Sequence, residues 1–156
     1  MYFSTVGIVS DHAGRDLKKL LVELLSTMEI TVEDLGVAYE VETSVDYPDY
    51  AGLLASRISQ KKLDGGIAIC GTGIGMSIAA NKYPGVRAGV VWSEFSARMS
   101  REHNDSNLLC LGSRTLNEHR AADFAKIWLE TAFAKGHHQI RIDKISKIEK
   151  KNGLHI

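Results

Sequence analysis

Residues 65–82 read GGIAICGTGIGMSIAANK, and this stretch decides the fold. Residues 65–71 form an apolar run of strand length, and Ile74 to Asn81 reads as a short helix. Between them lies a turn with three glycines in five residues (71–75), which lets the backbone approach a ligand closely. The amides at a helix start favour an anion. The stretch therefore predicts a strand, an anion-binding turn and a helix, in that order.

The same alternation of strand and helix runs through the rest of the chain. Further strands are expected at Thr5–Ser10, Ile30–Leu35, 87–92 and 108–113. Further helices are expected after Gly14, at Asp49–Gln60, at Glu94–His103, and from the cap Asn117 to about Phe133. Apolar strands indicate a sheet covered on both faces, and strand–helix alternation demands parallel strands. We predict an α/β fold: a Rossmann-like, doubly wound, mostly parallel five-stranded sheet with helices on both faces.

The chain length of 156 residues is that of one domain, so we expect a single domain over 1–156. After Gly136 the sequence becomes a charged segment with spaced isoleucines. We expect this C-terminal helical tail, 136–156, to dock on its own domain or on a partner subunit.

The composition excludes several classes of protein. Nineteen basic and nineteen acidic residues leave no net charge, so no global field draws the chain to nucleic acid or to an anionic membrane. The two cysteines match neither a disulfide framework nor a metal-binding spacing. No stretch has the length of a membrane span or the pattern of a secretory leader. We expect a cytoplasmic protein with no metal site.

Cys70 is a candidate base or nucleophile. It directly precedes the glycine turn, where the amides of a helix start stabilise a thiolate. The alternative is a small buried core residue, which is also how we interpret Cys110 in LLCLG. The turn lacks the GK[ST] of a nucleotide P-loop. Counting a dinucleotide fingerprint from Gly71 or Gly73 places Met76 or Ile78 at the third glycine, so NAD binding is not expected.

Two pairs of polar residues lie at the ends of a predicted strand and a predicted helix. Asp11-His12 follows the first strand, at the carboxyl-end edge of the sheet where doubly wound folds bind ligands. His103-Asn104 closes a helix, whose C-terminal dipole end favours a protonated histidine. Each pair is either functional or only a helix cap. For His103-Asn104, the cap would have Asn104 in a left-handed conformation.

Arginines are the candidate phosphate ligands, because they make charge-assisted hydrogen bonds. Arg114 directly follows a strand, and Arg141 stands in the tail between two isoleucines. Arg87 begins a strand and so lies at the wrong end of the sheet.

Five motifs together resemble one family: SDHAG (10–14), VDYPDYA (45–51), ICGTGIGMSIAANK (69–82), SARMSREHND (96–105) and LGSR (111–114). The chain is similar to the ribose-5-phosphate isomerase B family, which includes galactose-6-phosphate isomerase relatives. The similarity runs from the first strand to about Ile145.

The resemblance implies an aldose–ketose isomerase that works through a cis-enediolate without metal or organic cofactor. Cys70 would move the proton between neighbouring carbons, and His103 would open the furanose ring. Thr72, Asn104 and the amides of 71–75 would stabilise the enediolate. The implied substrate-binding residues are Asp11, His12, Tyr47, Gly71, Gly73, Ile74, Gly75, Asn104, Arg114, His137 and Arg141. The expected substrate is ribose 5-phosphate, in the pentose phosphate pathway.

The resemblance also implies a homodimer, or a dimer of dimers, in which tail residues serve the partner's phosphate site. Arg141 matches the second tail arginine of the family, but His137 replaces the first. Histidine is shorter than arginine and is not a bidentate fork. A sister isomerase for a tetrose, allose or galactose phosphate is therefore an alternative, and a catalytically silent subunit is another.

Overall fold

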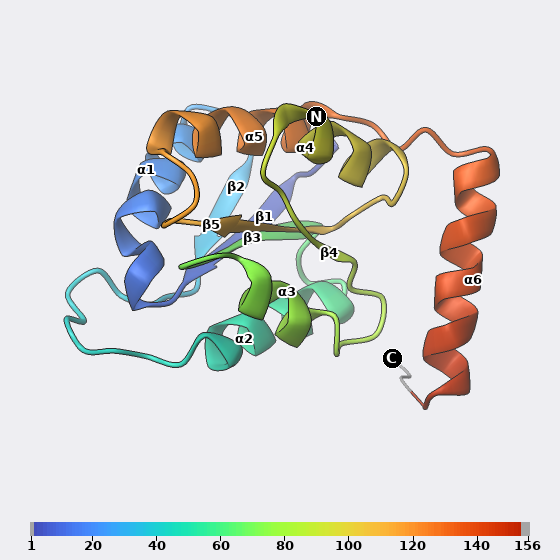
Figure 1. The fold of residues 1–156 in the computed structure, drawn as a ribbon, viewed down its shortest axis with the longest axis horizontal. Coiled ribbons are helices and arrows are strands. Elements are labelled where there is room, and N and C mark those ends of the chain that lie inside the picture. The colour runs from blue at the N-terminus through green and yellow to red at the C-terminus, as the bar shows by residue number, and fades with distance from the viewer. Residues whose placement is uncertain (1, 154–156) are drawn as a thin grey trace.

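The computed structural model describes residues 2–153 and contains a five-stranded parallel sheet in the order β2-β1-β3-β5-β4 (Figure 1). The strands are β1 (Thr5–Ser10), β2 (Thr31–Asp34), β3 (Gly65–Cys70), β4 (Ala88–Val90) and β5 (Leu108–Gly112). The helices are η1, a 3₁₀ turn (His12–Gly14), α1 (Arg15–Ser26), α2 (Tyr47–Ser59), α3 (Ile74–Ala80), α4 (Glu94–Glu102), α5 (Glu118–Glu130) and α6 (His137–Lys151). The predicted doubly wound α/β domain is confirmed, and every strand pair is parallel.

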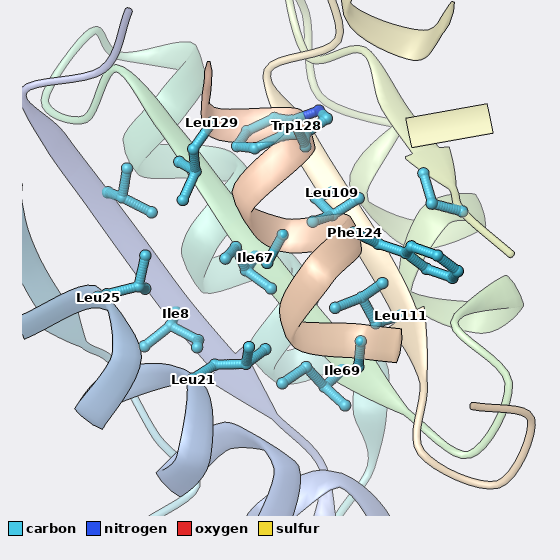
Figure 2. Packing of buried hydrophobic residues seen from close by; sticks show 14 of the residues in the cluster. Ile8, Leu21, Leu25, Ile67, Ile69, Leu109, Leu111, Phe124, Trp128 and Leu129 are labelled. Carbon is cyan, nitrogen blue, oxygen red and sulfur yellow. The ribbon is translucent and has the colours of Figure 1, made fainter. Parts of the chain in front are cut away.

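Helices cover both faces of the sheet, which explains why all six residues of β3 are buried. On one face α1 and α5 pack against β1, β3 and β5, with Ala97 of α4 in the same cluster. Figure 2 shows Phe124 and Trp128 of α5 among the strand side chains of this cluster. Trp128 is fully buried, and its ring stacks on Phe3 with 4.5 Å between centroids. This core fixes the relative positions of the three central strands.

The second face is covered by α2 and α3, which pack against each other and against β1 and β3. Met76 of α3 and Leu54 of α2 are fully buried there. Cys70 and Cys110 belong to the same cluster. The helix that follows the glycine turn is therefore held rigidly against the sheet.

The C-terminal helix α6 covers neither face and runs past the β4 edge of the sheet (Figure 1). Ile142 is buried, and the Gly85 N–H donates to the Glu149 carboxylate at 3.2 Å. Most of the tail's isoleucines stay exposed: Ile140, Ile145 and Ile148. The expected inclusion of Phe133 in the preceding helix is wrong, because α5 ends at Glu130.

No helix among residues 2–153 combines the length and apolar character required to cross a bilayer.

Candidate active site

The carboxyl ends of β1, β3 and β5 meet at one edge of the sheet, because the strands are parallel. Two backbone hydrogen bonds tie their loops together: Asp11 N–H donates to the Ile69 carbonyl at 3.0 Å, and Ser113 N–H donates to the Cys70 carbonyl at 2.9 Å. The predicted convergence of the loops after these strands is confirmed.

The glycine turn wraps its backbone around the Cys70 sulfur. Gly73 adopts φ +77°, and a methyl group at that position would come within 3.0 Å of the Leu111 backbone, so both the conformation and the space require glycine. In this geometry the Gly73 N–H donates to Cys70 Sγ at 3.1 Å. The turn therefore points a backbone donor at the sulfur. Cys70 is only 5% exposed, so this thiol is shielded yet lies at the edge where the loops meet.

Cys110 provides the contrast. It lies in the middle of β5 and is fully buried. Burial, together with the neighbouring Cys70, raises the pKa of the Cys110 thiol far above its ordinary value of 9.0. It stays protonated at neutral pH, as expected of a core residue.

Asp11 acts as the cap of η1, because its Oδ1 accepts the N–H groups of Ala13 and Gly14 at 2.9 and 3.2 Å. Asp11 is 6% exposed and lies at the same edge of the sheet as Cys70. His12 is half-buried, and its Nδ1 accepts the Val45 N–H at 3.3 Å. The loop that leads into α2 is thereby held beside the end of β1.

Tyr47 begins α2, and its ring lies directly over the glycine turn. A methyl group at Gly75 would come within 2.7 Å of this ring. From the β5 side the exposed Arg114 lies against Gly71, where a methyl group would meet its Cδ at 3.3 Å. Thr72 is exposed at the tip of the turn.

We call this group the carboxyl-end site. Its members are Asp11, His12, Tyr47, Cys70, the turn Gly71–Gly75 and Arg114.

The structure does not bring His103 to this site within one chain. His103 is the C-terminal cap of α4, which runs back from the carboxyl end of the sheet to the amino end. The carbonyl of the next residue, Asn104, accepts a hydrogen bond from Arg87 Nε at 3.0 Å, and Arg87 directly precedes β4. Cys70 pairs with Gly112, which lies four residues beyond the start of β5. Along the strands, about 13 Å therefore separates Cys70 from the amino end of the sheet, where the end of α4 lies.

Three histidine rings pack together at the amino end, and we call them the histidine stack. His103 stacks on His138 with ring centroids 4.1 Å apart and an angle of 14°, and the His137 ring is tilted against His138 at 3.9 Å and 41°. Arg141 Nη1 is 3.4 Å from His138 Nδ1. The two tail residues implied by the resemblance, His137 and Arg141, therefore lie beside His103 and not beside Cys70.

Burial lowers the pKa of His138 from its ordinary value of 6.5, and the neighbouring His137, His103 and Arg141 lower it further, against an opposite effect of Glu102. His138 is not among the residues that the sequence motifs single out. Its position next to His137 at the start of a helix gave no sign that it would pack on a residue 35 positions earlier in the chain.

One of the two alternatives for His103-Asn104, a cap with Asn104 in a left-handed conformation, is corrected at the end of α4. The residue with positive φ there is Asp105, at +43°, and not Asn104. Asp tolerates this conformation nearly as well as Asn, so the motif permitted either assignment.

Among residues 2–153, no group of three or more His, Cys, Asp or Glu side chains is arranged to hold a metal ion.

The family model for ribose/galactose isomerase matches residues 6–145. A putative sugar phosphate isomerase of Bacillus subtilis, YwlF, is 47% identical over 147 residues, covering 94% of this chain and 98% of the relative. Ribose-5-phosphate isomerase B of Escherichia coli is 42% identical over 141 residues, covering 90% and 93%.

Solved structures agree with these relatives. Ribose-5-phosphate isomerase B of Clostridium thermocellum superposes with a TM-score of 0.91 at 45% identity, covering 95% of this chain and 99% of that one. The enzyme of Mycoplasma genitalium with bound ribulose 5-phosphate gives a TM-score of 0.89 at 43% identity, covering 94% and 96%. The match spans the glycine turn, the α4 end and most of α6. The chain therefore belongs to the ribose/galactose isomerase family, the family of the ribose-5-phosphate isomerase B enzymes.

Proposed function

We propose that this isomerase interconverts ribose 5-phosphate and ribulose 5-phosphate, with Cys70 as base and His103 as ring-opening acid. The observation that carries the proposal is the Cys70 thiol, which accepts the Gly73 N–H at 3.1 Å from the glycine turn. The relatives named for ribose-5-phosphate isomerase, one of them solved with ribulose 5-phosphate, support this choice of substrate.

The chemistry needs a base and a place for negative charge. The Cys70 thiolate takes the proton from C2 of the open aldose and returns it to C1. A second proton moves from the C2 hydroxyl to the C1 oxygen. The C1 aldehyde becomes an alcohol and C2 becomes a ketone, so the balance requires no outside oxidant or reductant. A carbon acid is weak, and donors aimed at the developing oxyanion lower the barrier. Thr72 and the amides of 71–75 are the proposed donors, with Asn104.

We assign the sugar and phosphate contacts to both groups of residues. Asp11 would bind sugar hydroxyls, and Tyr47 would close the site over Gly75. His12 and Arg114 would hold the phosphate from the side of the carboxyl-end site. His137 and Arg141 would hold it from the histidine stack.

The two groups can form one site only if two chains share it. The base and the acid lie about 13 Å apart along the sheet of one chain, far beyond the reach of one reacting carbon. We therefore propose a homodimer in which each site takes Cys70 from one chain and His103 from the other. A twofold pair would make two such sites.

Exposed apolar side chains on α3 and in the segment after the edge strand β4 support this pairing. Ile74 and Ile78, one turn apart on α3, are 54% and 58% exposed, and Trp92 and Phe95 are 67% and 73% exposed. Large exposed apolar side chains that gather on one side of a molecule mark an interaction surface. A groove of about 470 Å³ also lies between α6 and β4, lined in part by Asn81, Gly89, Ile145 and Ile148. The tail would then dock on its own α4 and on the partner together.

A sister isomerase is the second candidate, because of His137. The His137 ring packs against His138 with 3.9 Å between centroids, and the His137 side chain is shorter than that of an arginine. The contacts to the phosphate would therefore differ from the family pattern. Turnover of a tetrose, allose or galactose phosphate in preference to ribose 5-phosphate would identify such a sister isomerase. A silent subunit is the weaker alternative, since Cys70 and His103 are both present. A cytoplasmic enzyme of the pentose phosphate pathway is the setting that we propose.

The test is ketose formation from a panel of ribose, allose, galactose and erythrose phosphates with a chelator present. We expect ribose 5-phosphate to be turned over best, and Cys70→Ala to abolish turnover while the matched control Cys110→Ala retains it. Preference for another sugar would assign a sister isomerase. Activity that survives in Cys70→Ala would refute the assigned base.

A further inference from the structure

We infer that Arg87 and Arg101, acting through Asp105, are positioning residues that hold the catalytic His103 in place by fixing the turn that follows it. The inference rests on the proposed acid role of His103. It extends that role to two arginines at the amino end of the sheet, neither of which is expected to touch the substrate.

Asp105 is the centre of the arrangement. Its φ of +43° is uncommon for a residue other than glycine and has to be held by its surroundings. Each carboxylate oxygen accepts a hydrogen bond from a different arginine. Oδ1 accepts from Arg101 Nη1 at 2.8 Å, and Oδ2 accepts from Arg87 Nη2 at 2.9 Å. Such charge-assisted bonds are about twice as strong as neutral ones. The carboxylate is thereby fixed from two elements at once.

Arg87 also grips the backbone of the turn. Its Nε donates to the carbonyl of Asn104 at 3.0 Å, and its Nη2 donates to the carbonyl of Asp105 at 2.8 Å. The planar guanidinium offers five donors in a fixed fork, which lysine cannot imitate. One side chain therefore holds two successive carbonyls and a carboxylate.

Arg101 anchors the other side of the turn in the core. Its side chain is 6% exposed, and its guanidinium lies 4.7 Å from the Phe3 ring centroid and 5.7 Å from that of Trp128. Its Nη1 donates to the Ser106 carbonyl at 2.6 Å, directly after Asp105. The turn is thus tied to β4 by one arginine and to the main core by the other.

The arginines hold the backbone and leave the functional side chains free. His103 and Asn104 are both exposed. A shift of about 1 Å in a reacting group can cost on the order of a hundredfold in rate. Loosening this turn should therefore lower the rate of the chemical step without removing a substrate contact.

The test is a double-mutant cycle between Arg87→Met and His103→Ala. We expect Arg87→Met to lower kcat by about tenfold or more while KM changes by less than about threefold. In the His103→Ala background, Arg87→Met should lower kcat by less than about twofold further, because its effect acts through His103. Arg57→Met is the matched control, since it breaks another arginine–carboxylate pair, with Glu33 at 2.6 Å, and should leave kcat unchanged.

Arg101 is too deeply buried for a clean substitution, so Arg87→Lys and Asp105→Asn serve as second variants in the same cycle. The inference would be overturned if Arg87→Met lowered kcat by the same factor in the His103→Ala background as in the wild type. An unchanged kcat in Arg87→Met alone would also overturn it. If His103→Ala itself keeps the wild-type kcat, the acid role in the proposed function fails, and the inference falls with it. A loss in His103→Ala beside an unchanged Arg87→Met would sink the inference alone.

Discussion

Two inactive variants, Cys70→Ala and His103→Ala, should restore activity when their chains are mixed. The structure places the two side chains at opposite ends of one sheet, about 13 Å apart along the strands. If each site joins the base of one chain to the acid of the other, a mixed dimer contains one site with both substitutions and one site with neither.

The expected magnitude follows from counting sites. Random pairing of equal amounts gives about one half mixed dimers, and half of the sites in each are intact, so the mixture should reach about one quarter of wild-type specific activity. Mixed dimers isolated with two different affinity tags should reach about one half. The assay is ketose formation from ribose 5-phosphate after exchange of the chains, with the fraction of mixed dimers measured by native mass spectrometry.

The matched control mixes Cys70→Ala with a chain that carries both substitutions. That pair offers no intact site in any arrangement and should stay inactive. Mixed dimers that are present in the expected amount but have no activity above the parents would refute the shared site. So would a chain that is monomeric at assay concentration.

Three further outcomes are expected. Gly75→Ala should raise KM several-fold with little change in the melting temperature. The added methyl meets the Tyr47 ring at 2.7 Å, and only that ring has to move. An unchanged KM would count against the closure of the site by Tyr47. Trp128→Phe should lower the free energy of unfolding by about 1–3 kcal/mol in urea titrations, since it removes the 2.7 Å bond from Nε1 to Ser106 and leaves a cavity. Because the folded-state pKa of His138 lies below its ordinary 6.5, the unfolded chain binds this proton more readily, and the stability contributed by the neutral ring is lost as pH falls from 6.5 through the folded value. His138→Gln should flatten that part of the stability profile, and an equal slope in both proteins would contradict the assignment.

The pattern of the chain anticipated most elements closely. The pattern predicts the glycine-turn strand and helix at 65–71 and Ile74–Asn81, and the structure has them at Gly65–Cys70 and Ile74–Ala80. Asn117 caps α5 as expected, accepting the Arg120 N–H at 2.9 Å. Local signals of this kind lie within a few residues of each other, so they can be read without the fold.

Arg87 shows where the pattern is insufficient. Its position before a strand correctly places it at the amino end of the sheet, but this position is weighed only for a phosphate ligand. The contacts that give it a role come from Asn104 and Asp105, 17 and 18 positions away. The stack of His138 on His103 spans an even larger gap of 35 positions. Such partners depend on which element the fold lays beside which, and no periodicity encodes that.

The sequence by itself determined the α/β class, the glycine turn at Cys70 and the family resemblance, because each depends on short runs of residues whose type and spacing act locally. Only the tertiary structure decided the strand order and the path of α6 along the β4 edge. It also decided the separation of Cys70 from His103 to opposite ends of the sheet. That separation follows from a helix returning antiparallel to its strands, so the end of α4 lies a full strand length from the end of β3.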